Sequence, residues 1–183
     1  MTRVVAGTFK GRRLRTPPGD STRPTSDRVR ESMFGTLTST FGGLDGLRVL
    51  DLFAGSGAIG IEALSRGAAH ADLVDADRKA AATIRANLAE LEIRSARVHP
   101  VKAAVFVRTP PVEPYDLVVL DPPYAVPTAE VTGLVATLLD PAWCDPDGLV
   151  VVERSSRDPF VWPEGADARD ERTYGETTLW YGR

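Results

Sequence analysis

The sequence has few of the residues that bind metals or form covalent cross-links. Its 183 residues include one cysteine, Cys144, and two histidines, His70 and His99. A single cysteine cannot form an internal disulfide, and two isolated histidines do not suggest a metal site. No apolar run approaches the roughly 20 residues that a membrane span needs, and the first residues lack the apolar core of a signal peptide. These absences favour a cytoplasmic protein.

The remaining composition is that of a globular protein, with 43% hydrophobic and 26% charged residues. Such a chain can bury a sizeable core in one domain. Its charge is unevenly distributed, with a balance of +5 over residues 1–40 and −8 over residues 41–183. Arginine supplies seven of the eight positive charges in the first part, and its planar guanidinium suits phosphate. We therefore expect a basic, nucleic-acid-facing extension over 1–40 and a catalytic domain over 41–183. The alternative is a solvated basic tail.

Strand and helix patterns alternate from residue 48 onward. Strands are predicted at 48–53, 71–74, 96–99, 115–120 and 148–153, and helices at 58–65, 78–91 and 129–139. This alternation is typical of an α/β fold whose parallel sheet is covered by helices on both sides. The chain ends in an antiparallel hairpin, 168–174 and 177–181. Before residue 48, we expect a short hairpin at 4–6 and 12–14, and then a helix after Pro24 capped by Ser26 or Asp27.

A glycine-rich loop joins the first strand of this series to the helix after it. Gly55, Gly57 and Gly60 fit G-x-G-x-x-G, and Asp75 follows Gly55 by twenty residues. This pattern predicts a nucleoside-type ligand, usually a nicotinamide dinucleotide. Asp51 argues against the dinucleotide, because its carboxylate would repel a pyrophosphate. S-adenosylmethionine instead carries an ammonium and a sulfonium. Two alternatives stay open: Asp51 only ties down the loop backbone, or Asp77 replaces Asp75 at the ribose.

The most informative stretch is Asp121-Pro122-Pro123-Tyr124, directly after the strongly apolar strand 115–120. In a parallel sheet this position lies beside the glycine loop. Asp121 and the Pro122 carbonyl can accept the two N–H groups of an exocyclic amine on a base, which aims the nitrogen lone pair at a methyl donor. The prolines fix the backbone, and Tyr124 can stack on a base that has left its surroundings. The alternative is that these residues merely turn the chain.

These motifs resemble the (D/N)PP(Y/F) methyltransferases of exocyclic amines. Over essentially its whole length the chain resembles the bacterial RsmD-type family, which makes N2-methylguanosine in 16S ribosomal RNA. The resemblance is carried by residues 3–7, 11–14, 23–31, 51–58, 62–67, 121–124 and 174–175. The stretch Arg23-Pro-Thr-Ser-Asp-Arg-Val-Arg-Glu31 is its most specific part.

The resemblance implies a seven-stranded, mainly parallel methyltransferase sheet and S-adenosylmethionine as the cofactor. The residues implied for the cofactor are Asp51, Phe53, Ala54, Gly55, Ser56, Gly57, Asp75, Ala76, Ala103 and Asp121. The catalytic residues implied are Asp121, Pro122, Pro123 and Tyr124. The residues expected to bind RNA are Arg12, Arg13, Arg15, Arg23, Arg28 and Arg30.

The implied partner is 16S ribosomal RNA in a partly assembled small subunit, methylated at a guanine-966-type position by a monomeric enzyme. One departure concerns the adenine of the cofactor. Related enzymes often place an Asp or Asn before Ala after the third strand, whereas this chain has Lys102-Ala103. The Ala103 N–H could still reach an adenine ring nitrogen, but the side-chain acceptor is missing.

Three rival functions are considered. An adenine-N6 methyltransferase of RNA or DNA would use the same tetrapeptide, although no separate target-recognition domain is evident. A nicotinamide-dependent oxidoreductase would explain the glycine loop but leave Asp121–Tyr124 without a role. A noncatalytic RNA-binding assembly factor would explain only the basic extension.

Overall fold

The structure is a computed structural model that describes residues 2–18 and 26–183. The helices are α1 Asp27–Phe41, α2 Ala58–Ser65, α3 Arg78–Glu90, α4 Ala103–Phe106 and α5 Thr128–Leu138. The strands are β1 Thr2–Arg3, β2 Arg13–Leu14, β3 Arg48–Leu52, β4 His70–Val74, β5 Ala96–His99, β6 Tyr115–Leu120, β7 Cys144–Ser155, β8 Ala168–Tyr174 and β9 Thr177–Gly182.

Most of the predicted elements are confirmed, and the ranges of α2, β5 and β6 are those expected. Three details differ. Strand β1 lies at residues 2–3 rather than at 4–6, and both β1 and β2 are only two residues long. Their pairing is extended by the Val4 N–H, which donates to the Arg12 carbonyl, and by the Gly11 N–H, which donates to the Val4 carbonyl. Strand β7 begins at Cys144 rather than at residue 148, because Cys144 pairs with Tyr115 before the register shifts. The short helix α4 was not predicted, since four residues are too few to show a helical period.

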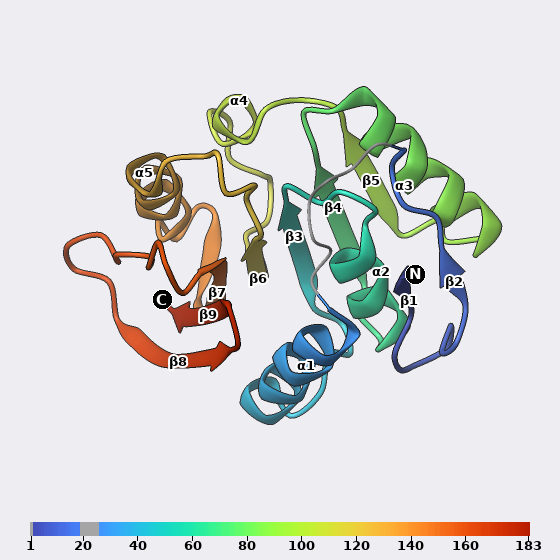
Figure 1. The fold of residues 1–183 in the computed structure, drawn as a ribbon, viewed down its shortest axis with the longest axis horizontal. Helices are drawn as coiled ribbons and strands as arrows, with labels where there is room; N and C mark the ends of the chain where they lie inside the picture. The colour runs from blue at the N-terminus through green and yellow to red at the C-terminus, as the bar shows by residue number, and fades with distance from the viewer. Residues whose placement is uncertain (1, 19–25) are drawn as a thin grey trace.

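Seven strands form one sheet in the order β5-β4-β3-β6-β7-β9-β8 (Figure 1). The pairs from β5 to β7 are parallel, and β9 is antiparallel to both β7 and β8. The predicted fold class is therefore confirmed. The chain leaves β3 toward β4 on one side, whereas β6 lies on the other side of β3. Ligands of parallel α/β sheets bind at such a switch point, beyond the carboxyl ends of the strands.

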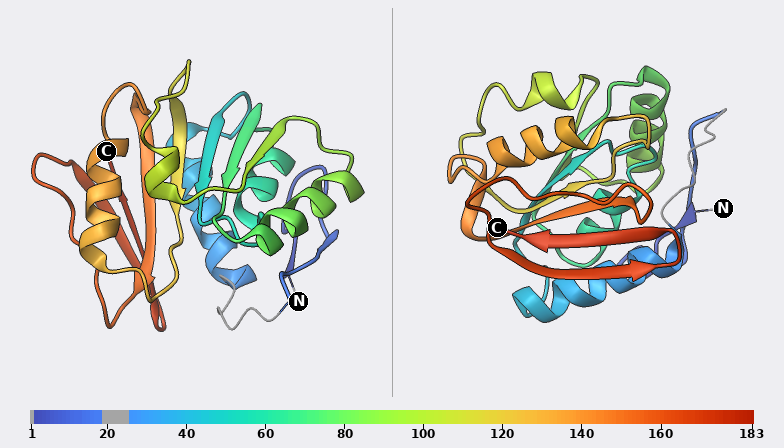
Figure 2. Two further views of the ribbon diagram at one scale, coloured as in Figure 1. Left: turned by 90° about the horizontal axis from the view of Figure 1, so that it is seen from above. Right: turned by 60° about the vertical axis from the view of Figure 1, so that its left-hand side comes forward.

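Helices cover both faces of the sheet, as Figure 2 shows. Helices α1 and α2 pack on one face through apolar residues such as Phe34 and Ile59. Helix α3 packs beside them through Ile84. Helices α4 and α5 cover the other face, where Val131 and Val135 contact the sheet. Strands buried on both faces need continuous apolar runs, which explains why β6 was recognisable from sequence.

The N-terminal arm, defined here as residues 2–18, is fastened to the helices that flank the glycine loop. The buried carboxylate of Glu62 in α2 accepts the N–H groups of Val5 and Ala6 at 2.7 and 2.9 Å. Ser65 accepts the Phe9 N–H and donates to the Ala6 carbonyl, at 2.9 and 2.6 Å. The basic arm is thus held by hydrogen bonds to the sheet-packing helix α2.

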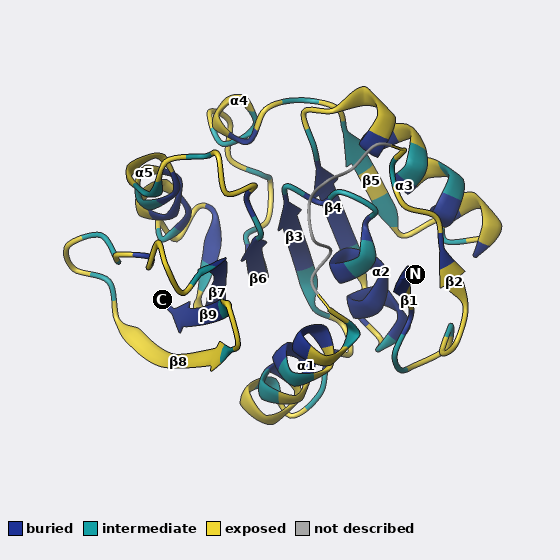
Figure 3. Cartoon of the chain, in the orientation of Figure 1, coloured by how far each residue is buried: buried dark blue, intermediate teal, exposed yellow. Residues whose placement is uncertain are grey.

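Helix α1 continues this extension and shares the core of the sheet. Ser26 caps it by accepting the Val29 N–H at 3.2 Å, which confirms one of the two predicted caps. Figure 3 shows the buried face of α1 turned to the sheet and its exposed face turned outward, as expected for an amphipathic helix. The edge strand β8 is mostly exposed and carries charged residues, which discourage pairing with another chain.

Candidate active site

Three carboxylates meet at the carboxyl ends of the central strands. Asp51 lies in β3, Asp75 follows β4 and Asp121 follows β6. Strand β3 pairs with both β4 and β6, so that Asp51 and Leu52 lie between the two neighbours. The sheet therefore brings together residues separated by seventy positions in sequence. Such a concentration of negative charge favours a cationic ligand and opposes a pyrophosphate.

Asp51 is almost completely buried and only partly satisfied. Its Oδ2 accepts the Gly60 N–H, in the first turn of α2, at 2.9 Å. Its Oδ1 is buried and has no hydrogen-bond partner among the described residues. Burial raises the pKa of Asp51 to about 7; the Gly60 hydrogen bond opposes the rise, and the charges of Asp121 and Asp75 add to it. A cation near Oδ1 would satisfy this oxygen and stabilise the ionised form.

Asp75 and Asp77 have different local roles. Asp75 accepts the N–H groups of Gly55 and Asp77, each at 2.8 Å, and stays partly exposed. Asp77 caps α3 by accepting the Lys79 N–H at 2.8 Å. Asp75 is thus tied to the glycine loop, whereas Asp77 is tied to the start of α3.

The glycine loop has the backbone that its sequence pattern demands. Gly57 precedes α2 at φ 78°, a left-handed conformation that suits glycine. A Cβ at Gly60 would lie 2.5 Å from the Cδ2 of Leu73, so a larger residue here would force the Leu73 side chain to move. Phe53 also has a positive φ, 62°, which is uncommon for a bulky residue and typical of functional loops. Ser56 is held through its carbonyl by the buried Asn87 of α3, at 2.9 Å.

The tetrapeptide Asp121–Tyr124 leaves the sheet beside this loop. The Asp121 N–H points to the Leu52 carbonyl of the neighbouring strand, at 3.4 Å. Pro122 is buried, whereas Tyr124 is 60% exposed, so its ring is available to stack on a base. The Pro123 carbonyl accepts the Val126 N–H at 2.9 Å and closes a turn. The Pro122 carbonyl accepts no hydrogen bond from the described residues, which leaves it available to an amine.

The segment after β5 places Lys102 and Ala103 at the start of α4. Lys102 is exposed and its side chain does not cap the helix. The buried Ala103 occupies the first turn, where backbone N–H groups have no helical acceptor. Ala76, in the turn between Asp75 and α3, is exposed, and Ala54 is buried in the glycine loop.

The basic residues proposed for RNA divide into two groups. Arg12, Arg13, Arg15 and Arg28 are exposed and can reach a phosphate. Arg30 is 1% exposed, so the prediction that it binds RNA is wrong. Its guanidinium is directed inward because it donates to the Arg3 carbonyl and pairs with Asp27 at 2.9 Å. Arg23 lies outside the described residues.

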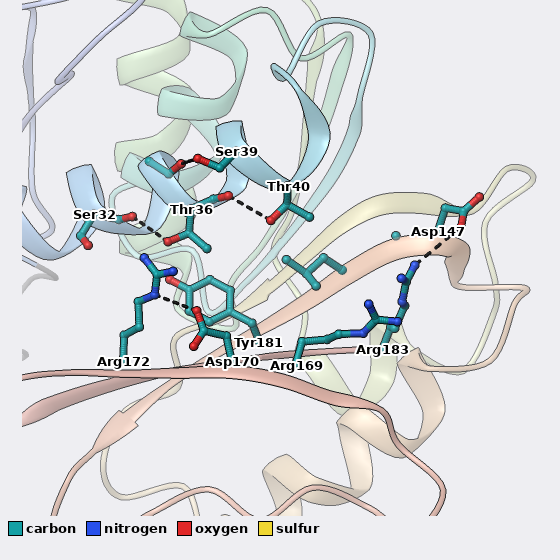
Figure 4. A pocket seen from close by; sticks show the side chains of 13 residues that line it. Ser32, Thr36, Ser39, Thr40, Asp147, Arg169, Asp170, Arg172, Tyr181 and Arg183 are labelled. Atoms are coloured by element: carbon teal, nitrogen blue, oxygen red, sulfur yellow. Dashed lines mark hydrogen bonds and ion pairs between the residues drawn. The ribbon is translucent and has the colours of Figure 1, made fainter.

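A hollow of about 520 Å³ lies elsewhere, between α1 and the strands β7, β8 and β9 (Figure 4). Hydroxyl groups of α1, such as Ser32 and Thr36, face arginines of the C-terminal hairpin across it. Arg172 is paired with Asp170 at 2.8 Å, and Arg183 lies 3.6 Å from Asp147. The charges that line this hollow are therefore paired. The hollow borders β7, and its lining includes none of the carboxylates Asp51, Asp75 and Asp121.

The sequence suggested that the two histidines are isolated, but the structure shows that they share a partner. His70 and His99 both contact the buried Asp72 through Nε2, at 3.0 and 2.6 Å. The Tyr115 hydroxyl donates to the same carboxylate at 2.8 Å. Although its burial opposes ionisation, the hydrogen bonds from His99 and Tyr115 hold the pKa of Asp72 below its usual range. Within residues 2–18 and 26–183 no group of His, Cys, Asp and Glu is arranged to hold a metal ion.

Cys144 is buried, and burial raises the pKa of its thiol to about 12. A thiol in this state is a poor nucleophile. Among the described residues, no helix combines the length and apolar character that crossing a bilayer requires.

Comparison with known proteins identifies the family. The family model described as "Conserved hypothetical protein 95" matches residues 2–183. Two relatives are called "Ribosomal RNA small subunit methyltransferase D". The one from Haemophilus influenzae is 33% identical over 94% of this chain and 89% of the relative. The one from Escherichia coli K12 is 38% identical over 82% of this chain and 73% of the relative. The chain belongs to this RsmD-type family.

Solved structures support the same assignment. The Escherichia coli protein yhhF, described as a candidate methyltransferase, superposes with a TM-score of 0.85 at 32% identity, covering 99% of this chain and 97% of that one. A ribosomal protein L11 methylase of Lactobacillus delbrueckii covers 93% of this chain and 84% of that one, with a TM-score of 0.66 and 15% identity. The latter likeness shows a shared fold alone.

Proposed function

We propose that this protein transfers a methyl group from S-adenosylmethionine to the exocyclic N2 of a guanine in small-subunit ribosomal RNA. One observation carries the proposal: Asp51, Asp75 and Asp121 converge at one sheet edge, between the glycine loop and Tyr124. Family membership supports the substrate class, because relatives bear the name ribosomal RNA small subunit methyltransferase.

The residues at this edge fit S-adenosylmethionine. The unpartnered Oδ1 of Asp51 suits the ligand's positive charge, and Asp75 has lone pairs left for the ribose hydroxyls. Gly55–Gly57 permits close approach of the ligand to the backbone, and the Ala103 N–H can donate to the adenine ring. When bound, the cofactor supplies an electrophilic methyl group.

The protein's part in the reaction is to position and polarise the amine. Asp121 and the Pro122 carbonyl accept its two N–H groups, so the nitrogen lone pair points to the methyl donor. The hydrogen bond to Asp121 strengthens as the nitrogen becomes positive, which lowers the barrier selectively. Tyr124 stacks on the extruded base, and its exposure fits that role.

The exposed Arg12, Arg13, Arg15 and Arg28 are proposed to bind the phosphate backbone near the target. We also propose that the RNA is methylated within a partly assembled small subunit and that the enzyme acts as a monomer. The nicotinamide rival is disfavoured because Asp51, Asp75 and Asp121 lie at neighbouring strand ends beside the glycine loop, where their charges would repel a pyrophosphate.

Product analysis tests the proposal. Small-subunit RNA from a strain lacking this protein, both free and in partly assembled particles, is incubated with enzyme and labelled S-adenosylmethionine, digested to nucleosides and separated by mass spectrometry. We expect N2-methylguanosine with the wild type and far less of it, over the same incubation, with Asp121→Ala. Labelled N6-methyladenosine would establish the adenine rival, and RNA binding without any methylation would establish the noncatalytic one.

A further inference from the structure

One buried side chain of α3 contacts both the N-terminal arm and the glycine loop. Asn87 is 1% exposed. Its Oδ1 accepts the Arg15 N–H at 2.9 Å, and its Nδ2 donates to the Arg15 carbonyl at 3.0 Å. The same Nδ2 donates to the Ser56 carbonyl at 2.9 Å. The amide can adopt only this orientation, because Nδ2 faces two carbonyl oxygens and Oδ1 faces an N–H.

The surrounding contacts make Asn87 the direct link between the arm and the loop. Arg12 donates to the Glu90 carbonyl at 3.2 Å, and Arg15 pairs with the Glu90 carboxylate at 3.2 Å. Both contacts lie at the end of α3 and do not reach the loop. Ser65 holds the other part of the arm on α2, and within the described part of the chain it makes no hydrogen bond to residues 55–57. Among residues 2–18 and 26–183, only the Asn87 amide bonds to Arg15 on one side and to Ser56 on the other.

We propose that Asn87 is a positioning residue that couples RNA binding at the arm to cofactor binding at the glycine loop. The inference rests on the proposed role of the arm in binding RNA. Phosphates held by Arg12, Arg13 and Arg15 restrict the arm, and the restricted arm fixes the Asn87 amide and with it the Ser56 carbonyl. Ordering a loop costs conformational entropy, so a loop that is already held binds its ligand more tightly.

Thermodynamic linkage makes the effect reciprocal: RNA tightens cofactor binding by the factor by which cofactor tightens RNA binding. This coupling favours the complex in which RNA and cofactor are bound together over complexes that hold only one of them. The linkage is carried by the backbone of Arg15, because both atoms that contact Asn87 are main-chain atoms. The Arg15 side chain has a separate role, because it pairs with Glu90 and is proposed to bind a phosphate of the RNA.

This separation provides a matched pair of variants. Arg15→Ala removes the side chain and keeps the N–H that Asn87 accepts. Arg15→Pro removes the side chain and the N–H together, and the preceding Leu14 lies in a strand, which is the conformation that a following proline requires. Asn87→Ala removes the link from its other end. Circular dichroism checks that each variant is folded, and the exposed Arg15 keeps the test available if Asn87→Ala does not fold.

Calorimetry measures the Kd of S-adenosylhomocysteine, which cannot be turned over, with and without saturating unmethylated small-subunit RNA. We expect RNA to lower this Kd about tenfold for the wild type and by a smaller factor, about fivefold, for Arg15→Ala, which keeps both contacts to Asn87 but loses one phosphate contact. The ratio should fall to within about twofold of one for Asn87→Ala, and clearly below the Arg15→Ala value for Arg15→Pro, which keeps only the carbonyl contact to Asn87. A merely structural role would weaken the ligand equally with and without RNA and leave the ratio unchanged.

Two outcomes would overturn the inference alone: a wild-type ratio of one despite RNA binding, or equal ratios for Arg15→Ala and Arg15→Pro. If the wild type binds no RNA, the proposed function and this inference both fail, and the missing RNA isotherm identifies that case.

Discussion

Cofactor binding should release a proton from Asp51 near neutral pH. In the cofactor-free protein burial raises the pKa of this carboxyl to about 7. A cation placed at the unpartnered Oδ1 favours the ionised form and lowers the pKa again. If the pKa falls well below 6, binding should release about 0.9 proton at pH 6, about 0.5 at pH 7 and about 0.1 at pH 8.

The assay is calorimetric titration in buffers of different ionisation enthalpy, because the observed heat then varies with the number of protons released. The amino group of the ligand titrates in the same range, so the control is Asp51→Asn, which keeps an oxygen for the Gly60 N–H but cannot lose a proton. The difference between the two proteins isolates the Asp51 contribution. Equal proton release by wild type and Asp51→Asn would refute the reasoning.

The substitution Asp51→Asn should stabilise the fold and at the same time weaken cofactor binding. A carboxyl whose folded pKa is about 7, against 3.8 for an unperturbed group, carries an ionisation penalty on the order of 4 kcal/mol. The folded state holds the proton more tightly, so the stability of the cofactor-free wild type falls as the pH rises from about 4 to about 7 and is flat above that. Asp51→Asn should therefore raise the Tm at pH 8. Its affinity for S-adenosylmethionine should fall by roughly 10- to 100-fold, the scale of a charge-assisted hydrogen bond.

Three further predictions address the other parts of the site. Asp75→Ala should weaken S-adenosylmethionine by about 1.5–3 kcal/mol in a titration; if Asp77→Ala is the impaired variant instead, the ribose acceptor is misassigned. Asp121→Ala should lower the single-turnover rate by on the order of 10²–10⁴ with little change in cofactor Kd, and Asp121→Asn, which keeps an acceptor oxygen, should retain more activity than alanine; wild-type rates in both would exclude a catalytic role. Replacing Arg12, Arg13 and Arg15 together by alanine should weaken RNA binding and reduce its dependence on salt, because fewer counterions are released. Cofactor affinity measured without RNA should stay unchanged. An unaltered salt dependence of RNA binding would contradict the role of the arm.

The candidate site was predictable where its signals are local in sequence. The glycine loop favours glycine at fixed positions, and the structure shows why at Gly57, which has a left-handed backbone with φ 78°. The position of Asp121 followed from the apolar run before it, because a strand buried on both faces must end where polar residues begin. In each case a short-range rule of backbone or burial operates on neighbouring residues.

The contacts missed from sequence are long-range polar ones. Asn87 was assigned to a helix but given no role, although it bonds to residues 31 and 72 positions away. Arg30 looked like another phosphate-binding arginine, yet its partners direct it into the interior. The buried Asp72 joins two histidines that appeared unrelated. A side chain's polar partners depend on which elements become neighbours, and no local pattern records them.

The sequence by itself determined the alternating elements, the cofactor-type loop and the tetrapeptide, because periodicity, glycine spacing and proline act over a few residues. Only the tertiary structure decided how these parts work together. The order of β4, β3 and β6 gathers three acids at one edge and leaves Asp51 with an unpartnered oxygen. The packing of the arm against α2 and α3 places Asn87 between Arg15 and Ser56. Burial and charge depend on everything that surrounds a group, and those surroundings exist only in the folded chain.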